Sequence, residues 1–584
     1  MGTGVKTIHS DDSQDFETNI RVMAGPGAGK TYWLIGQLRQ ILSHSTRLGN
    51  CRKAAVITYT NKATENICKQ IQFGMDRIEV STIHAFLYAN VIKPYFHLIA
   101  DKFGFDISKL DGHDDTIVTG REFINSLIGK QKVGWLFDAL KKKNKSINYN
   151  EVGNYIAKYR WTLYNDKAQL CQQGRKYNLY GAIDGDFVNA YKKDVWNQKG
   201  IMHDDDVLYF SYQLFELIPK IKKLVVNKFP YILVDEYQDS SSIQHYLIQQ
   251  LSNAGSFITV IGDEAQSIYG FANGNINFIK NIQLPNLQSY HIEDNRRSTK
   301  EIVDFLNIIR PNLQQNSIRK EHSIKPQIVI GSVIDACSYS KQCSKDESIV
   351  TLSRQNETAN DLRSQHMPNF KTTHLIDDIQ SLGDFRSRMF IACINAIENA
   401  RQMLMKDALK EIAKGFGLDM KKIKNKKKAV MFLRTLLEEY NEFKSGDGIK
   451  LLDVVKNKLH QNIAEVRSGK PKELYSHSYS EFAKEVRCKD NSSTDMTIHK
   501  AKGLEFKNVI VVFGDEQTAV DFLLSNDLDL DSQIAEEHRI YYVACSRACD
   551  RLFLSIPSLS EVNKRKIENK FNDKLQIRYF TSVH

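Results

Sequence analysis

The sequence predicts an α/β protein built from two parallel-sheet cores, each interrupted by a helical insertion. Short, continuous apolar runs occur in two groups along the chain, and such runs are typical of parallel strands that are buried on both faces. Segments with helical periodicity follow several of these runs, as a parallel α/β sheet requires. Two long stretches between the runs show helical patterns and no convincing strand signal.

The composition is that of a multidomain globular protein. The chain has 584 residues, which corresponds to about four domains of roughly 150 residues each. Hydrophobic residues make up 42% of the chain and charged residues 26%, so disordered and fibrous classes are excluded. The formal net charge is +11, and a positive excess favours polyanions as partners.

Neither the cysteines nor the N-terminal segment suggests export. The nine cysteines include no CxxC pair, which argues against a zinc knuckle and a disulfide framework and indicates a reducing compartment. The polar first residues lack a signal-peptide pattern, and no apolar run approaches the ~18 to 20 residues that span a bilayer. We therefore expect a soluble, cytoplasmic protein with no membrane partner.

The first group of strands begins near the N-terminus. IRVMA at 20–24 leads into a glycine-rich loop and then into a helical pattern. AAVITYT at 54–60 leads into the helical NKATENICKQI, and IEVSTI at 78–83 is a third strand-like run. YILVDE at 231–236 and SFITVIGDE at 256–264 complete the group. The last two end in acidic residues, as expected where buried parallel strands deliver side chains to a site at their carboxyl ends.

The second group of strands lies in the C-terminal half. KPQIVIGSV at 325–333, ESIVTLS at 347–353 and NVIVVFG at 508–514 predict strands. EEHRIYYVACSRACDRL at 536–552 predicts a helix. Between them, the lysine-dense KKIKNKKKA at 421–429 fits either a solvated helix face or a patch that binds duplex DNA.

These patterns set the predicted domain boundaries. The first core comprises residues 1–90 and 201–278, its helical insertion 91–200, the second core 279–371 and 485–584, and its reduced helical insertion 372–484.

The loop AGPGAGKT is a variant of the phosphate-binding P-loop, with alanine at the first position of the strict pattern. The small residues Gly25, Gly27 and Gly29 allow backbone N–H groups to turn inward around a phosphate, at the positive end of the following helix. Lys30 would then reach the β and γ phosphates, and Thr31 would hold Mg²⁺. The alternative is an ordinary glycine-rich turn with an exposed lysine.

Two polar sets follow neighbouring predicted strands. Asp235 and Glu236 stand where an enzyme that hydrolyses nucleotides needs one carboxylate for the metal and one to orient and deprotonate water. Acid pairs after strands are common, so a surface role is the alternative. Gln266, after the next strand, is a candidate sensor of the γ-phosphate or of the attacking water.

Further motifs stand in a fixed order along the chain: TYTNKA (58–63), STIHAF (81–86), HDDDVL (203–208), DEYQD (235–239), GDEAQSIYGF (262–271), NRRS (295–298), LSRQN (352–356), MTIHKAKGLEF (496–506) and EEHRIYYVACSRA (536–548). With the P-loop they cover nearly the whole chain. Together and in this order, they resemble the motifs of the UvrD/Rep/PcrA branch of superfamily-one DNA helicases.

The resemblance implies two RecA-like cores with ATP and Mg²⁺ between them and single-stranded DNA across both. Arg297 and Arg547 match the two arginine fingers of the family, which stabilise charge on the γ-phosphate. Glu505 matches the acid that meets the nucleotide sugar. Arg296 stands where the family has a tyrosine that stacks on adenine, and a guanidinium plane also stacks. The glutamine motif that reads adenine is poorly formed, with Gln14 as its candidate.

The resemblance also implies DNA-binding residues. Three ring-bearing residues match positions that stack bases or contact the DNA backbone, which suits a motor that ignores sequence because every base has a π-face; core packing is their alternative. These three are Tyr59, Phe271 and His499. Three polar residues match backbone contacts: Asn61, Thr82 and His84.

The predicted function is an ATP-dependent translocase on single-stranded DNA, a helicase that moves 3′ to 5′ and acts at duplex junctions. Ala272 replaces an arginine that the family places near the γ-phosphate, so one contact between nucleotide and DNA is missing. The alternative is therefore a DNA-sensing NTPase subunit that regulates a partner nuclease and unwinds little. The short format resembles the helicase-like subunit of Gabija anti-phage systems, which works beside a separate nuclease. Defence against phage and DNA repair are both open as pathways.

Overall fold

The computed structural model describes most of the chain, in two units. The described residues are 5–49, 51–71, 74–110, 112–113, 117–131, 149–173, 184–268, 277–344, 347–354, 375–382, 385–401, 404–418, 420, 423–459, 462–463, 465–488, 494–528, 530 and 532–579. The first unit comprises residues 1–349 and 501–584, and the second comprises 350–500.

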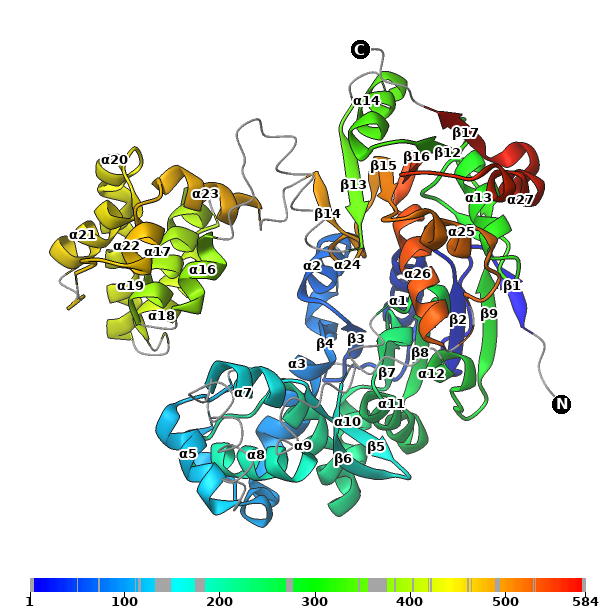
Figure 1. Ribbon diagram of the computed structural model, residues 1–584. Helices are drawn as coiled ribbons and strands as arrows, with labels where there is room; N and C mark the ends of the chain where they lie inside the picture. Colours follow the sequence, from blue (N-terminus) through cyan, green and yellow to red (C-terminus); the bar gives the residue numbers. More distant parts are fainter. Residues whose placement is uncertain are drawn as a thin grey trace. The chain divides into compact units, whose positions relative to one another are not determined.

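A seven-stranded, all-parallel sheet organises the N-terminal part of the first unit (Figure 1). Its strands, in spatial order, are β1 (Lys6–Ile8), β9 (Gln288–Ile292), β2 (Ile20–Ala24), β8 (Phe257–Gly262), β7 (Tyr231–Val234), β3 (Ala54–Thr58) and β4 (Ile78–Thr82). Every residue of β3 and β7 is buried. Their continuous apolar runs are explained by this burial, because both faces of the sheet are covered.

Two hydrophobic clusters cover the faces of this sheet. The helices of this part of the chain are α1 (Lys30–His44), α2 (Asn61–Gln70), α3 (Ile83–Leu87), α4 (Lys93–Tyr95), α9 (Asp204–Leu217), α10 (Lys220–Lys228), α11 (Ser242–Ala254) and α12 (Asn277–Asn281). One cluster contains side chains of α1, such as Trp33 and Leu38, and the other contains side chains of α3, α9, α10 and α11. This arrangement brings the carboxyl ends of β2, β7 and β8 to one edge.

A second, six-stranded sheet contributes four parallel strands to the first unit. In spatial order these are β15 (Phe506–Val512), β16 (Ala548–Ile556), β12 (Gln327–Ile330) and β17 (Gln576–Tyr579). The helices around them are α13 (Lys300–Ile309), α14 (Val333–Ser344), α25 (Glu516–Leu524), α26 (Gln533–Cys545) and α27 (Glu561–Phe571). A short parallel pair, β10 (Asp294–Asn295) and β11 (Asn316–Ser317), lies next to the phosphate loop through Asn295.

The second unit is largely helical. Its strands β13 (Ile349–Ser353) and β14 (Asp495–Thr497) pair in parallel. Its helices are α16 (Leu375–Ser381), α17 (Phe385–Arg401), α18 (Met405–Phe416), α19 (Ile423–Glu438), α20 (Tyr440–Phe443), α21 (Gly448–Lys458), α22 (Lys470–Tyr475), α23 (Tyr479–Cys488) and α24 (Ile498–Ala501). They enclose their own hydrophobic cluster. The lysines of the KNKKKA run are exposed on α19.

The predicted fold class is confirmed, because both sheets are parallel and alternate with helices. Two local predictions are wrong, one over residues 536–552 and one in the stretch 91–200. The helix predicted over 536–552 ends at Cys545, and Ala548–Ile556 forms strand β16. The apolar second half of β16 is buried between β15 and β12, so sheet pairing overrides the helical appearance of the preceding residues.

The stretch 91–200 contains a β-hairpin that the sequence analysis did not predict, beside the helices α5 (Arg121–Lys130), α7 (Tyr149–Ile156) and α8 (Gly185–Lys199). Its antiparallel strands are β5 (Tyr159–Tyr164) and β6 (Lys167–Gln172). The two-residue turn, Asn165 and Asp166, has φ of 46° and 58°. Two positive φ values at Asn-Asp are the signature of a type I′ hairpin turn. This dipeptide was the available signal for the hairpin.

A buried ionic network anchors the hairpin to α8 and α9. Asp206 is fully buried and accepts hydrogen bonds from Lys192 Nζ at 2.7 Å and from the indole nitrogens of Trp161 and Trp196, both at 2.9 Å. Lys192 also pairs with Asp205 at 3.0 Å. Burial alone would raise the pKa of Asp206, but Lys192 and His203 outweigh it and hold that pKa far below its usual range.

No helix in the described part of the chain is both long and apolar enough to cross a membrane.

We expect Lys192→Met to destabilise the first unit by about 3 to 5 kcal/mol, because it leaves two buried carboxylates without their cation. Chemical denaturation, followed by the fluorescence of Trp161 and Trp196, measures the change. The matched control is Lys130→Met, since Lys130 pairs with Asp194 at 2.8 Å but is 49% exposed. Its loss should cost less than about 1 kcal/mol. Equal effects of the two substitutions would contradict this account of the network.

Candidate nucleotide site

A cavity of about 510 Å³ lies at the carboxyl-edge side of the first sheet, entirely within the first unit. Residues that follow strands of the first sheet line one side of it, and residues that follow β10 and α26 or precede β15 line the other. Except for Gln14, all the residues that the sequence predicts to bind nucleotide or metal or to take part in hydrolysis lie in its wall. They are Gly25, Gly27, Gly29, Lys30, Thr31, Asp235, Glu236, Gln266, Arg296, Arg297, Glu505 and Arg547.

The phosphate loop connects β2 to α1. Gly27 and Gly29 have φ of 74° and 79°, in the left-handed region that glycine adopts without strain. A Cβ on Gly27 would lie 2.6 Å from Asn295 Oδ1, so this glycine also permits the close approach of β10. Asn295 donates to the Pro26 carbonyl at 3.0 Å. The loop lies at the N-terminus of a 15-residue helix, where the helix dipole favours an anion.

The acid pair follows β7 directly. Glu236 has φ of 51°, which is unusual for a residue other than glycine and is a form of backbone strain found at functional sites. Burial and the adjacent charge of Glu236 raise the pKa of Asp235 to about 7. Burial would also raise the pKa of Glu236, but Lys30 and Lys502 outweigh it and lower that pKa to about 2. The two carboxylates thus differ in electrostatic environment, although they are neighbours in the chain.

Gln266 meets one of the two arginines predicted to act on the γ-phosphate. The Gln266 Oε1 accepts a hydrogen bond from Arg547 Nη2 at 3.2 Å, and its Nε2 donates to Asp263 at 2.7 Å. Arg547 is 1% exposed. Burial, followed by the charge of Arg297, lowers the pKa of Arg547 to about 9. The carboxylates of Glu236, Glu505 and Asp263 oppose this lowering but do not cancel it, so an incoming phosphate would further stabilise the charged guanidinium.

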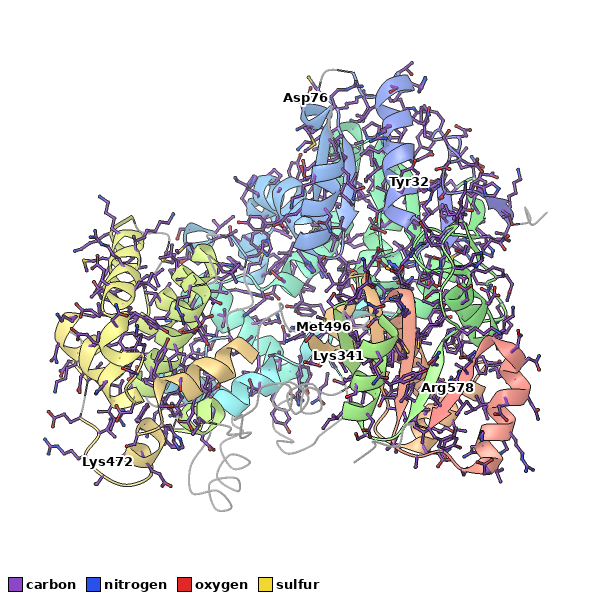
Figure 2. All side chains as sticks on the ribbon, turned by 90° about the horizontal axis from the view of Figure 1, so that it is seen from above. Tyr32, Asp76, Lys341, Lys472, Met496 and Arg578 are labelled. Atoms are coloured by element: carbon purple, nitrogen blue, oxygen red, sulfur yellow. The ribbon has the colours of Figure 1, made fainter. Side chains whose placement is uncertain are left out.

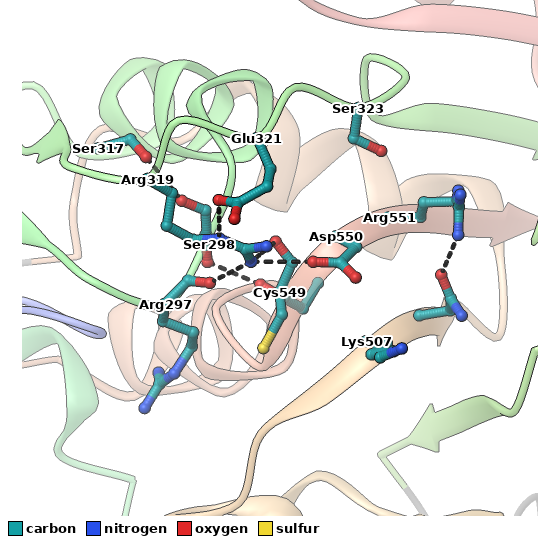
Figure 3. A network of polar contacts seen from close by, with 12 residues as sticks. Arg297, Ser298, Ser317, Arg319, Glu321, Ser323, Lys507, Cys549, Asp550 and Arg551 are labelled. Carbon is teal, nitrogen blue, oxygen red and sulfur yellow. Dashed lines mark hydrogen bonds and ion pairs between the residues drawn. The ribbon is translucent and has the colours of Figure 1, made fainter.

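Arg297 lies at the same cavity and pairs with Glu505. Its Nη2 is 2.6 Å from Glu505 Oε1, and its Nη1 donates to the Ser546 carbonyl at 3.0 Å. The backbone of Arg297 is held from behind by Arg319, which donates to the Arg297 carbonyl at 2.8 Å and pairs with Asp550 at 2.9 Å (Figure 3). The guanidinium of Arg297 is thus aimed into the cavity by a fixed backbone.

Arg296 is clamped at the rim of the cavity. Its guanidinium lies 4.7 Å above the ring of Tyr32, pairs with Asp11 at 2.6 Å and donates to the Ser10 hydroxyl at 2.7 Å. Figure 2 labels Tyr32 on α1. Tyr32 is 53% exposed and lines the cavity too. The site therefore presents an aromatic ring and a guanidinium plane together, both of which stack on bases. Gln14 does not line the cavity, and its backbone pairs with the side chain of Gln37.

Lys502 joins the site from the loop before β15. Its Nζ lies 2.6 Å from Asp239 Oδ2, and both side chains are nearly or fully buried. Burial raises the pKa of Asp239 to about 6, against the opposing effect of Lys502. Lys502 and Tyr32 were not among the predicted site residues. Both could have been found by considering every residue of their motifs, because Tyr32 follows Thr31 and Lys502 lies within MTIHKAKGLEF.

The residues predicted to bind DNA belong to both units, and two of them are not fully described. Tyr59 is 37% exposed and lines the nucleotide cavity. Thr82 caps α3 by accepting a hydrogen bond from the Ala85 backbone at 3.3 Å, and His84 is half-buried on the same helix. His499 is half-buried on α24. Phe271 and Ala272, and the side chain of Asn61, lie outside the described residues.

The residues present fit a magnesium nucleotide. Carboxylate and hydroxyl oxygens are the ligands that Mg²⁺ prefers, and Asp235 and Thr31 supply them beside the phosphate loop. The raised pKa of Asp235 indicates that a cation would stabilise its charged form. The cations Lys30, Arg297 and Arg547 around the same cavity match the negative charge of a triphosphate.

Comparisons with known proteins identify the family. Residues 7–286 match the model of the UvrD/REP helicase N-terminal domain, and residues 333–558 match that of the UvrD-like helicase C-terminal domain. The ATP-dependent DNA helicase PcrA of Staphylococcus aureus strain Mu50 is 23% identical, over 94% of this chain and 83% of that protein. PcrA of Staphylococcus epidermidis strain RP62A is 25% identical over 55% of this chain and 42% of that protein. The chain therefore belongs to the UvrD/Rep family of ATP-hydrolysing DNA helicases.

Proposed function

We propose that this protein uses Mg²⁺ and ATP to move 3′ to 5′ along single-stranded DNA and to separate duplexes at junctions. One observation carries the proposal: a single cavity is lined by the phosphate loop, by the acid pair and by two arginines from the opposite side. The polarity is inferred from the resemblance to the family. The relatives named PcrA are ATP-dependent DNA helicases, which supports the same activity in this chain.

In the proposed hydrolysis, each residue around the cavity has a separate task. Lys30 neutralises the β and γ phosphates, and Glu236 orients the attacking water and accepts its proton. Thr31 and Asp235 would hold Mg²⁺, which supplies positive charge to the phosphate oxygens when bound. Gln266 presents its Oε1 to the water, since its Nε2 already donates a hydrogen bond to Asp263.

The two arginines exchange partners during the proposed cycle. Arg297 pairs with Glu505 and Arg547 with Gln266, and both contacts are hydrogen bonds that phosphate oxygens can replace. Because these arginines come from the opposite side of the cavity, their transfer to the γ-phosphate would draw the two sides together. Hydrolysis and phosphate release would return them to Glu505 and Gln266. Repeated closure and opening would then move the DNA-contacting residues along the strand.

A regulatory NTPase beside a partner nuclease, as in Gabija-type defence, remains the alternative function. Separation of a duplex opposes the motor by ~1.4 kcal/mol for each base-pair step, so useful unwinding requires tight coupling between hydrolysis and movement. A subunit that only switches a partner has no such requirement. The two functions therefore differ in their ability to displace a strand.

Lys30→Ala should abolish ATP turnover, because no other group of the phosphate loop carries the positive charge that faces the phosphates. The steady-state ATPase rate in the presence of single-stranded DNA measures the effect, and thermal unfolding checks that the variant is folded. Lys199→Ala, at an exposed lysine of α8, is the matched control and should retain full turnover. Normal hydrolysis by the Lys30 variant would refute the assignment of the site.

Tyr32→Ala should raise the KM for ATP by about 5- to 150-fold, because stacking of the ring on the base contributes ~1 to 3 kcal/mol. Tyr32→Phe keeps the ring and serves as the control, with a KM close to that of the unchanged protein. Initial rates over a range of ATP concentrations give both constants. A KM for the alanine variant equal to that of the phenylalanine variant would exclude base stacking at this position.

The proposed motor should displace a labelled strand from a duplex with a 3′ single-stranded tail and leave a duplex with a 5′ tail intact. Single-stranded DNA should also stimulate hydrolysis, and this stimulation should weaken as salt rises because backbone contacts release counterions. Stimulated hydrolysis without displacement of either strand would instead support the regulatory NTPase.

A further inference from the structure

A buried ion pair connects the two sides of the nucleotide cavity through Arg310, a residue that no predicted motif includes. Arg310 Nη1 donates to Asp263 Oδ1 at 2.6 Å, and the two side chains are 4% and 1% exposed. Asp263 follows β8 of the first sheet. Arg310 is the C-terminal cap residue of α13, a helix that packs on β16 of the second sheet.

Asp263 in turn fixes Gln266. Its Oδ2 accepts from Gln266 Nε2 at 2.7 Å, and its Oδ1 accepts from the Ala265 backbone at 3.1 Å, so it caps the short helix that presents the glutamine. The amide of Gln266 therefore has one orientation, with Oε1 toward Arg547. Arg310 binds the same carboxylate from the far side, and so it determines where that carboxylate lies.

Arg297 lies on the same chain segment as Arg310, just before the helix that Arg310 caps. α13 begins at Lys300, three residues after Arg297, and ends one residue before Arg310. Its ten residues span about 15 Å at 1.5 Å per residue. A movement of Arg297 toward phosphate therefore displaces the same rigid element that holds Asp263 through Arg310.

Other charged groups near this pair come from neighbouring elements. Lys280 of α12 pairs with Glu264 at 2.5 Å, and His291 of β9 lines the same cavity of about 240 Å³ as Arg310 and Asp263. Burial lowers the pKa of His291, and the charge of Arg310 lowers it further. The contacts from Arg310 to Gln266 run through Asp263.

We propose that Arg310 is a positioning residue, which acts through Asp263 to orient Gln266 and to link its position to that of α13. This rests on the proposed function, in which Gln266 orients the attacking water. The link makes the orientation of Gln266 depend on where the second sheet and its helices stand relative to the first.

The test compares Arg310→Gln with the double variant Arg310→Gln, Asp263→Asn. The single variant leaves a buried carboxylate without its cation, and the double variant removes both charges, so it folds even if the single variant does not. Arg310→Lys keeps the charge and one donor. The control is Arg551→Gln, which removes a more exposed arginine that pairs with Glu347 at 3.2 Å, away from the cavity.

Two measurements are made on the full-length chain. The first is kcat and KM for ATP with saturating single-stranded DNA. We expect kcat to fall about 10- to 100-fold in both glutamine variants, as for a catalytic group displaced by about 1 Å. KM should stay within about twofold, because contacts to bound ATP are retained. Arg310→Lys should recover part of kcat, and Arg551→Gln should match the unchanged protein.

The second measurement is hydrogen exchange of the backbone amides of residues 263–268 without nucleotide. We expect faster exchange in both glutamine variants and no change in the control. If the unchanged protein hydrolyses no ATP, the proposed function fails, while the exchange result still tests the link from Arg310 to this segment. A folded glutamine variant with unchanged kcat, or with unchanged exchange of this segment, overturns the role of Arg310.

Discussion

Buried positive charge around one cavity is the constraint on which the site depends. Arg547 is almost completely enclosed, and burial together with the nearby Arg297 lowers its pKa to about 9. Such an arrangement is costly unless anions compensate it. Glu505 provides part of that compensation by pairing with Arg297, and Gln266 gives Arg547 a neutral hydrogen-bond acceptor. A triphosphate between the phosphate loop and the arginines would provide more negative charge. This additional compensation favours closure of the cavity when nucleotide binds.

Three polar contacts within the first unit complete the connection between its two sides. Lys502 pairs with Asp239, Arg310 pairs with Asp263, and Arg539 donates to the Ser267 carbonyl at 2.9 Å. Each joins a residue that follows β7 or β8 to a residue that belongs with the second sheet. Leaving one partner of a buried ion pair alone costs several kcal/mol of stability. We therefore expect these contacts to break together, in a larger movement, and not one at a time.

The sequence predicts the fold class and the nucleotide site because both depend on local patterns. Continuous apolar strands followed by polar residues, such as Asp235 and Glu236 after β7, require only the neighbouring residues to be recognised. β16 was missed because its first residues continue the pattern of α26, and only pairing with β12 and β15 makes it a strand. Arg310 carries no signal at all in the sequence, since its importance arises from a carboxylate that is 47 residues away.

The DNA-binding residues are less predictable than the nucleotide site, because they do not form one local pattern in the sequence. A phosphate loop binds its ligand with backbone groups that follow one another in the chain, so its sequence and its function coincide. DNA contacts come from side chains on separate elements, such as Thr82 before α3 and His499 on α24, and each of these also has a local structural role or half-buried surroundings. Thr82 shows the difficulty, because the hydroxyl that would meet a DNA phosphate already caps α3. A hydroxyl can donate to phosphate while it accepts from the backbone, so capping and DNA contact are compatible at this residue.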